Sequence, residues 1–212
     1  MPGRVMPQRD ASRLHQVNSD DLRAALLAGD LSRPRLTWYD DSSGERIDLS
    51  GKTLVNWVAK AANWLEAEMS LEPGDVVRLD MPADHWRTIY WSLAAGTRGV
   101  TITTDADADA CVSFTSDDAD LIEPVAALAA SPLQAMSDAM PGPVGPVSWE
   151  APTLADDVAT GSRVLLSDAD VTDVPALTAA LIVRGCSVLV VRGGDEQARS
   201  ARSASEAVTV VL

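Results

Sequence analysis

Between residues 35 and 104, stretches with an apolar residue at every second position are interleaved with stretches that have an apolar residue at every third or fourth position. Arg35 to Tyr39 alternates with a period of two, Asp40 to Gly44 is a turn, and Glu45 to Leu49 reads as a return strand. This pattern predicts a β-hairpin. After it, Leu54, Trp57, Val58, Ala61, Trp64, Leu65 and Met69 follow helical spacing, which predicts a helix from about Gly51 to Met69.

The pattern then repeats along the same region. Pro73-Gly74 turns the chain, Val76 to Met81 reads as a strand, and the apolar residues between Trp86 and Gly99 share one face of a second helix. Val100 to Thr103 is short and rich in β-branched residues, as strands are. Strands that alternate with helices at this spacing are typical of βαβ units and of a mostly parallel sheet.

A second group of elements follows near the C-terminus. Arg163 to Leu166 predicts a strand, Val174 to Val183 a helix, and Glu196 to Ala204 a polar-faced helix. Ser187 to Val191 is a continuous apolar run, as expected of a central parallel strand, and Val208 to Leu212 reads as a last strand. The sequence therefore predicts an α/β fold with a mixed, mainly parallel sheet flanked by helices.

The remaining segments are less regular. Residues 1–18 read as a loose lead-in, after which Ser19 is the expected N-cap of a short helix that ends at Gly29. Cys111 to Phe114 predicts a strand. Val125 to Ala130 is ambiguous between strand and helix, and we favour a strand because prolines bracket it closely.

Residues 140–146 contain three prolines and two glycines, a composition that excludes a hydrogen-bonded ladder. We predict a surface linker there. The whole chain, 1–212, is then one α/β domain, and a division into two lobes, 19–139 and 147–212, is the alternative.

Composition narrows the possible functions. The chain has 212 residues, is 46% hydrophobic and carries a formal net charge of −14, which argues against nucleic-acid binding. No stretch approaches the roughly 20 apolar residues of a membrane span. Cys111 and Cys186 lie in apolar runs, where a thiol behaves as a small hydrophobic residue, so we do not expect them to form disulfides. We expect an acidic, cytoplasmic protein of bacterial origin that binds neither membrane nor nucleic acid.

Candidate chemistry is sparse. Asp105, Asp107 and Asp109 imitate the start of a calcium loop, but Ala110 and Ser116 occupy the positions that need glycine and glutamate. Asp168, Asp170 and Asp173 fail the same test. His15 and His85 have no metal-binding neighbours at the required spacing. No nucleophile motif is present. We therefore predict no catalytic, cofactor-binding or metal-ligating residue.

Tryptophans offer one further hypothesis. Trp86 and Trp91 fall on different sides of the second predicted helix, so at least one of them, Trp91, is expected to be partly exposed and to mark a contact surface.

Residues Arg35 to Thr104 resemble the N-terminal segment of the adenylate-forming superfamily, which includes acyl-CoA synthetases, luciferases and peptide-synthetase adenylation domains. The residues that carry this resemblance are Leu36-Thr37-Trp38-Tyr39, Leu49 to Val58, Leu71 to Val77, and Met81-Pro82 followed by Trp86 to Gly99. A weaker match covers Arg163 to Leu166 and Ala176 to Val191. The resemblance implies the AMP-binding fold.

The sequence also departs from that family. The interval between the two matched segments lacks the Ser/Thr/Gly-rich phosphate-binding loop, and Asp156, Asp157, Asp168 and Asp170 would repel a triphosphate. The family's downstream adenylate motifs and its C-terminal lobe with a catalytic lysine would lie beyond Leu212. The resemblance therefore implies a truncated, non-adenylating relative without a cofactor.

Three functions compete at this point. The first is a non-catalytic interaction or oligomerisation module, because an unpaired last strand would leave a sheet edge for a protein partner or a second copy. The second is a binder of a small acyl or nucleotide molecule. The third is a ligase fragment that another chain completes.

Overall fold

A five-stranded sheet contains the predicted hairpin and the C-terminal strands. The structure, a computed structural model, describes residues 14–154, 158–167 and 171–212. The strand order is β11-β9-β10-β2-β3, in which all neighbours are parallel except β2 and β3. The bounds are Val210–Val211 (β11), Arg163–Leu166 (β9), Ser187–Arg192 (β10), Pro34–Asp40 (β2) and Glu45–Ser50 (β3). The apolar run at 187–191 forms the middle strand, as predicted.

A four-stranded sheet is entirely parallel, with the order β5-β4-β6-β7. Its strands are Thr101–Thr103 (β5), Val76–Asp80 (β4), Ala110–Ser113 (β6) and Leu121–Ile122 (β7). Together the two sheets confirm the predicted α/β class with mixed, mainly parallel sheets flanked by helices.

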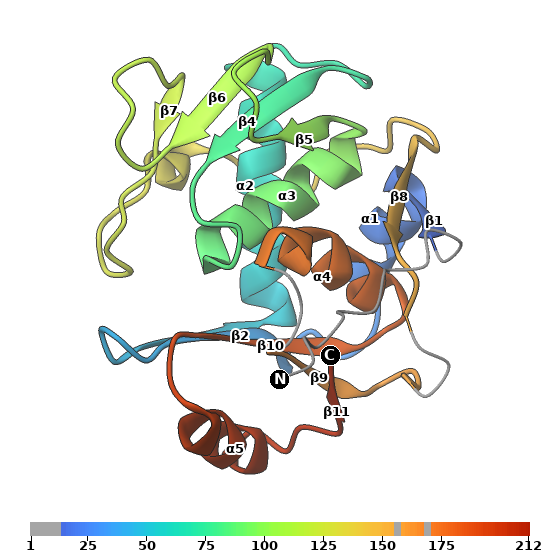
Figure 1. The fold of residues 1–212 in the computed structure, drawn as a ribbon. Coiled ribbons are helices and arrows are strands. Elements are labelled where there is room, and N and C mark those ends of the chain that lie inside the picture. The colour runs from blue at the N-terminus through green and yellow to red at the C-terminus, as the bar shows by residue number, and fades with distance from the viewer. Residues whose placement is uncertain (1–13, 155–157, 168–170) are drawn as a thin grey trace, which may run out of the picture.

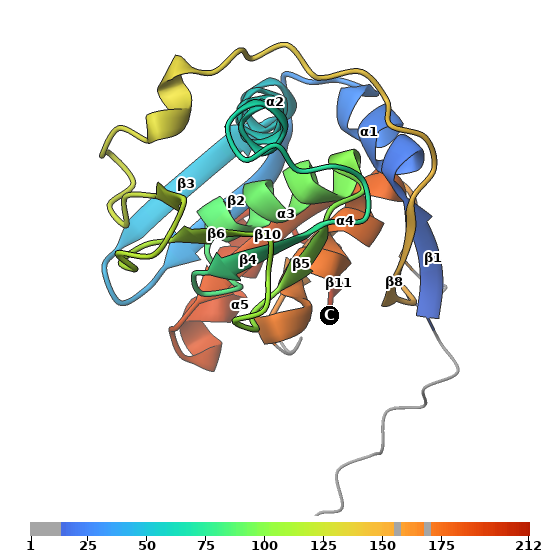
Figure 2. The same cartoon turned by 90° about the horizontal axis from the view of Figure 1, so that it is seen from above.

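Three helices fill the space between the two sheets (Figures 1 and 2). These are α2 (Gly51–Ala67), α3 (Trp86–Arg98) and α4 (Val174–Val183), while α5 (Glu196–Ser205) covers the outer face of the five-stranded sheet. The first helix, α1 (Ser19–Leu27), packs beside α3 and α4. Every residue of α3 except Ser92 is buried, because sheets and helices surround this helix.

The start of α2 shows how the sequence sets an element boundary. The Ser50 side chain accepts a hydrogen bond from the backbone N–H of Thr53, which satisfies a free donor of the first turn. Leu54, Val58 and Leu65 are fully buried, so the predicted apolar face is the one that packs into the core.

The structure corrects the prediction for residues 14–18. They form a strand, β1 (Leu14–Asn18), which pairs antiparallel with β8 (Ser148–Pro152) in a third, two-stranded sheet. The N-cap of α1 is Asn18 rather than Ser19, and its Oδ1 accepts from the Asp21 N–H at 2.9 Å. Two short 3₁₀ helices complete the described elements, η1 (Pro132–Ala135) and η2 (Val171–Asp173).

The predicted strand at 125–130 is wrong, because this segment forms turns. Two backbone carbonyls of this segment bond to a side chain instead of to a neighbouring strand. Arg87 donates hydrogen bonds to the carbonyls of Ala126 and Ala129, at 3.2 and 3.3 Å.

Residues 140–146 contain no helix or strand, as their composition predicts. Arg23 and Arg98 donate hydrogen bonds to the carbonyls of Pro141 and Gly142, and Ser19 donates to Gly145. The main cluster of buried residues draws on the chain both before and after this segment. A division into lobes at 140–146 stays a prediction. Among the described residues, no helix has the length and apolarity needed to cross a membrane.

Candidate functional site

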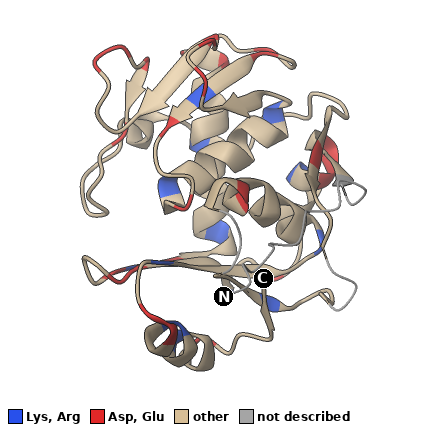
Figure 3. Ribbon diagram, in the orientation of Figure 1, with Lys and Arg blue, Asp and Glu red and all other residues tan. Residues whose placement is uncertain are grey.

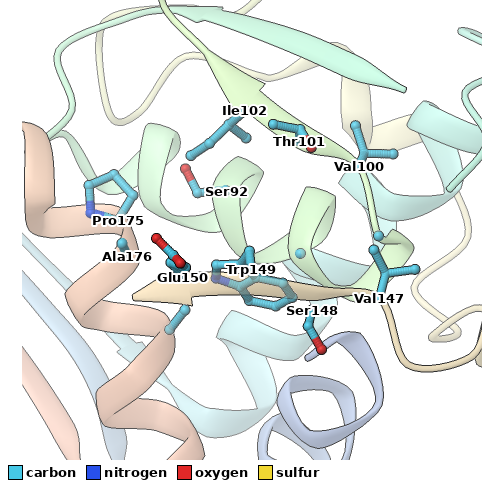
Figure 4. Close-up of a pocket in the computed structure, with 13 residues that line it drawn as sticks. Ser92, Val100, Thr101, Ile102, Val147, Ser148, Trp149, Glu150, Pro175 and Ala176 are labelled. Carbon is cyan, nitrogen blue, oxygen red and sulfur yellow. The ribbon is translucent and has the colours of Figure 1, made fainter. Parts of the chain in front are cut away.

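A groove lies between β5 on one side and β8 and α4 on the other, with α3 at its base (Figure 4). One part of it has a volume of about 260 Å³, and a neighbouring part that extends towards β4 has about 340 Å³. Ser92, Ile102 and Pro175 line both parts, so they form one continuous depression. Its size falls within the range of ligand and peptide-binding clefts.

Two glycines of the α3 region allow β8 to approach closely. A Cβ atom on Gly96 would lie 2.9 Å from Leu22 Cδ2 and 3.2 Å from an indole carbon of Trp149. Gly99 ends α3 in the left-handed conformation, with φ of 67°. The shape of the groove therefore requires residues without a side chain at positions 96 and 99.

The groove walls are mainly apolar. Figure 4 shows Ile102 of β5 pointing towards Ser92 of α3, with Glu150 entering from β8. The Ser92 hydroxyl already donates to the Thr88 carbonyl at 2.8 Å, and Glu150 is the one charged side chain among the described lining residues. Among the described residues that line the groove, none is a histidine or cysteine that could activate the serine. The groove therefore offers mainly apolar contacts and one carboxylate.

His85 caps the N-terminal end of α3 and does not itself line this groove. Its Nδ1 accepts a hydrogen bond from the Arg87 backbone N–H at 3.1 Å, and the side chain is buried. Burial, together with nearby Arg87 and Arg192, lowers the pKa of His85 from 6.5 to about 3. The imidazole is therefore neutral at physiological pH.

This pKa shift predicts an acid-sensitive contribution to stability. Below pH 6.5 the unfolded chain binds a proton at His85 and the folded chain does not, so stability falls as pH drops towards 3. When the pH falls from 7 to 5, we expect the free energy of unfolding to decrease by about 2 kcal/mol more in wild type than in His85→Asn, a variant that keeps a capping side chain. Urea unfolding at both pH values measures this difference, and equal losses for the two proteins would contradict it.

The most deeply buried charged residues form a cluster that the sequence analysis did not predict. Glu123 is fully buried and accepts hydrogen bonds from the Tyr90 hydroxyl at 2.5 Å, the Trp91 indole N–H at 2.9 Å and Arg87 at 3.3 Å. Burial and the Glu123 carboxylate raise the pKa of Tyr90. All four residues are at most 1% exposed, so these hydrogen bonds lie inside the core.

The hypothesis that Trp91 is partly exposed is wrong. Trp91 is 0% and Trp86 3% exposed, because α3 has protein on all sides rather than one wet face. The Trp91 N–H is used internally, by Glu123.

The acidic candidates do not converge. Asp105, Asp107 and Asp109 are exposed, and Asp109 accepts a hydrogen bond from the Val76 N–H at 2.8 Å. Within the described ranges, no three His, Cys, Asp or Glu side chains are placed to hold a metal ion. Asp156, Asp157, Asp168 and Asp170 lie outside the described residues. Cys111 and Cys186 are buried free thiols.

The fold of this chain is similar to that of part of several solved enzymes. Acetoacetyl-CoA synthetase from Streptomyces lividans matches with a TM-score of 0.68 and 14% identity, over 92% of this chain and 42% of that one. The N-terminal domain of FACL13 from Mycobacterium tuberculosis matches with a TM-score of 0.64 and 16% identity, over 91% and 61%. The chain thus has the fold of part of the N-terminal lobe of adenylate-forming enzymes, as Arg35 to Thr104 predicted.

In sequence, the chain is 34% identical over 145 residues to a Mycobacterium tuberculosis protein described as a TIGR03089 family protein. That match covers 66% of this chain and 56% of the relative, so the chain spans little more than half of the relative's length. No family model matches the chain.

Proposed function

We propose that this chain is a non-catalytic interaction module built on the adenylate-forming fold, which binds an extended polypeptide segment alongside β5. The observation that supports this most directly is that β5 is an edge strand of the four-stranded sheet and lies beside the apolar groove. Exposed sheet edges recruit extended segments through backbone hydrogen bonds, and adjacent pockets take their side chains.

The backbone of β5 has the required donor. The Thr101 N–H points inward and donates to the Asp75 carbonyl at 2.8 Å. Because backbone groups alternate in direction along a strand, the N–H and C=O of Ile102 point away from β4. The Ile102 side chain is 39% exposed and lines the groove. One residue thus presents both a free backbone pair and an apolar contact.

The acidic residues around β5 indicate which charge the partner segment carries. Asp105, Asp107 and Asp109 are exposed directly after β5, and Glu150 lines the groove. Figure 3 shows acidic positions in the loops of the four-stranded sheet. A second copy of the chain would place these carboxylates against one another at a net charge of −14 per chain. A segment with apolar residues flanked by lysine or arginine complements both the groove and its rim.

The non-catalytic part of the proposal is supported by the sequence between the two segments that resemble adenylate-forming enzymes. A phosphate cradle needs glycines and a cation, whereas Pro141 to Pro146 and the pair Asp156-Asp157 stand there. We expect the purified chain to give no ATP–pyrophosphate exchange with acyl or amino acid substrates. Exchange by the isolated chain would overturn this part of the proposal.

A selection from a phage library of random short peptides tests the docking surface. We expect the selected peptides to alternate apolar residues and to carry lysine or arginine, and their binding to slow hydrogen exchange at the Ile102 amide. Ile102→Pro removes the outward N–H without removing a bond to β4, and should weaken binding about tenfold or more. Ile102→Val keeps the donor and the apolar contact and should bind normally.

Two results would overturn this assignment. Selected peptides that bind Ile102→Pro as tightly as wild type would place the docking surface elsewhere. A dimer that light scattering detects in wild type but not in Ile102→Pro would make a second copy, rather than a basic segment, the occupant of the β5 edge.

A further inference from the structure

A separate cavity of about 460 Å³ lies where parallel strands of both sheets end. Asp40 and Arg192 are the last residues of β2 and β10, Pro82 follows β4, and Phe114 follows β6. Crevices outside the carboxyl ends of parallel strands are the usual ligand sites of open α/β sheets. None of the lining residues is shared with the groove beside β5.

Three aromatic rings form the inner wall of this cavity. The ring centroids of Trp38 and His85 lie 5.0 Å apart, and those of His85 and Phe114 lie 4.8 Å apart with an interplanar angle of 78°. The Trp38 indole N–H donates to the Asp84 carbonyl at 2.8 Å, which fixes its orientation. Such walls favour a flat ring over a flexible aliphatic chain.

His85 supplies one unsatisfied hydrogen-bond donor. Since its Nδ1 accepts from the Arg87 N–H, the proton of the neutral ring is on Nε2. The residue is 2% exposed and lines the cavity, yet Nε2 has no hydrogen-bond partner among the residues that the structure describes. Nε2 is not among the buried side-chain atoms that lack a partner, so its N–H is open to the cavity, where an acceptor atom on a ligand can receive it.

The outer part of the cavity is acidic. Asp40 accepts its hydrogen bonds from Ser42 and Ser43 through Oδ1, which leaves Oδ2 available, and Glu45 lies beside it. Arg192, the only cation among the lining residues, lies 3.7 Å from the Asp84 carboxylate. The remaining charge favours a cationic ligand group.

We propose that this cavity binds a small aromatic amine whose ring carries a hydrogen-bond acceptor. The ring lies against Trp38 and Phe114, the acceptor receives the Nε2–H of His85, and the ammonium group lies near Asp40 and Glu45. Each part of the ligand thus corresponds to one chemical feature of the cavity.

Calorimetric titration with three related compounds tests the proposal. Tyramine has the ring, the acceptor and the cation; phenethylamine lacks the phenolic oxygen; 4-hydroxyphenylpropionate replaces the cation with an anion. We expect saturable binding of tyramine, and weaker binding of each of the others by about fivefold, as the loss of one interaction of about 1 kcal/mol gives.

Three variants locate the contacts. His85→Asn retains a helix cap and should remove the difference between tyramine and phenethylamine. Glu45→Gln should weaken both amines about equally, and Glu68→Gln, which changes an exposed carboxylate that does not line the cavity, should change neither. The absence of saturable tyramine binding, or equal binding of tyramine and 4-hydroxyphenylpropionate, would overturn the proposal. Unchanged discrimination in His85→Asn, with a native unfolding curve, would also overturn it.

Discussion

Replacing Glu123 with alanine is expected to lower the free energy of unfolding by about 3–5 kcal/mol, the usual cost of leaving a buried charge without its partner. The Arg87 side chain is 1% exposed and would lose its ion pair, while the Tyr90 hydroxyl and the Trp91 N–H would lose their acceptor. Urea unfolding of the two proteins measures the change.

The pair Glu66 and Arg98 provides a matched control. Glu66 is 54% exposed and lies 3.0 Å from Arg98, so Glu66→Ala should cost about 0–1 kcal/mol, as surface pairs do. Replacing both partners of the buried pair with apolar residues, as in Arg87→Met with Glu123→Leu, should cost less than Glu123→Ala alone. Equal costs for Glu123→Ala and Glu66→Ala would contradict the assigned role of the cluster.

Local periodicity explains why so much of the fold was predictable. The hairpin, α2, α3 and α4 each satisfy their own pattern of apolar spacing, and the structure places them within a residue or two of the predicted bounds. Pairing between distant segments leaves no such pattern. β1 and β8 join residues 14–18 to residues 148–152, so neither strand had a neighbour that could be recognised along the chain.

The groove and the aromatic cavity were not predictable, for the same reason. Ile102, Trp149 and Pro175 come from three separate elements, and no motif joins them. His85 was assigned no site role from the sequence, because its position beside Trp38 and Phe114 depends on elements that are distant along the chain. Sequence spacing identifies faces of elements, whereas these sites arise where several elements end together.

Replacing Gly99 with alanine is expected to lower the free energy of unfolding by about 2–4 kcal/mol, because two separate penalties add at this position. The backbone is left-handed, with φ of 67° and ψ of 22°, a conformation that penalises any Cβ. A Cβ atom would also lie 2.7 Å from Val147 Cγ2 and 3.4 Å from Pro73 Cβ. Thermal or urea unfolding measures the loss.

Two further variants separate the penalties. Val147→Gly removes both Val147 atoms that would lie within 3 Å of the new Cβ, namely Cγ2 at 2.7 Å and Cβ at 2.9 Å, but not the backbone strain. In the Val147→Gly background, Gly99→Ala should therefore still cost about 1–2 kcal/mol. Gly142→Ala is the control, because a Cβ there meets no atom within 4 Å. Val147 accepts a hydrogen bond from the Ser19 N–H and directly precedes β8, so displacing it should also disturb the groove. If Gly99→Ala were as stable as Gly142→Ala, the close approach of β8 to the end of α3 would be wrong, and with it the wall of the proposed docking surface.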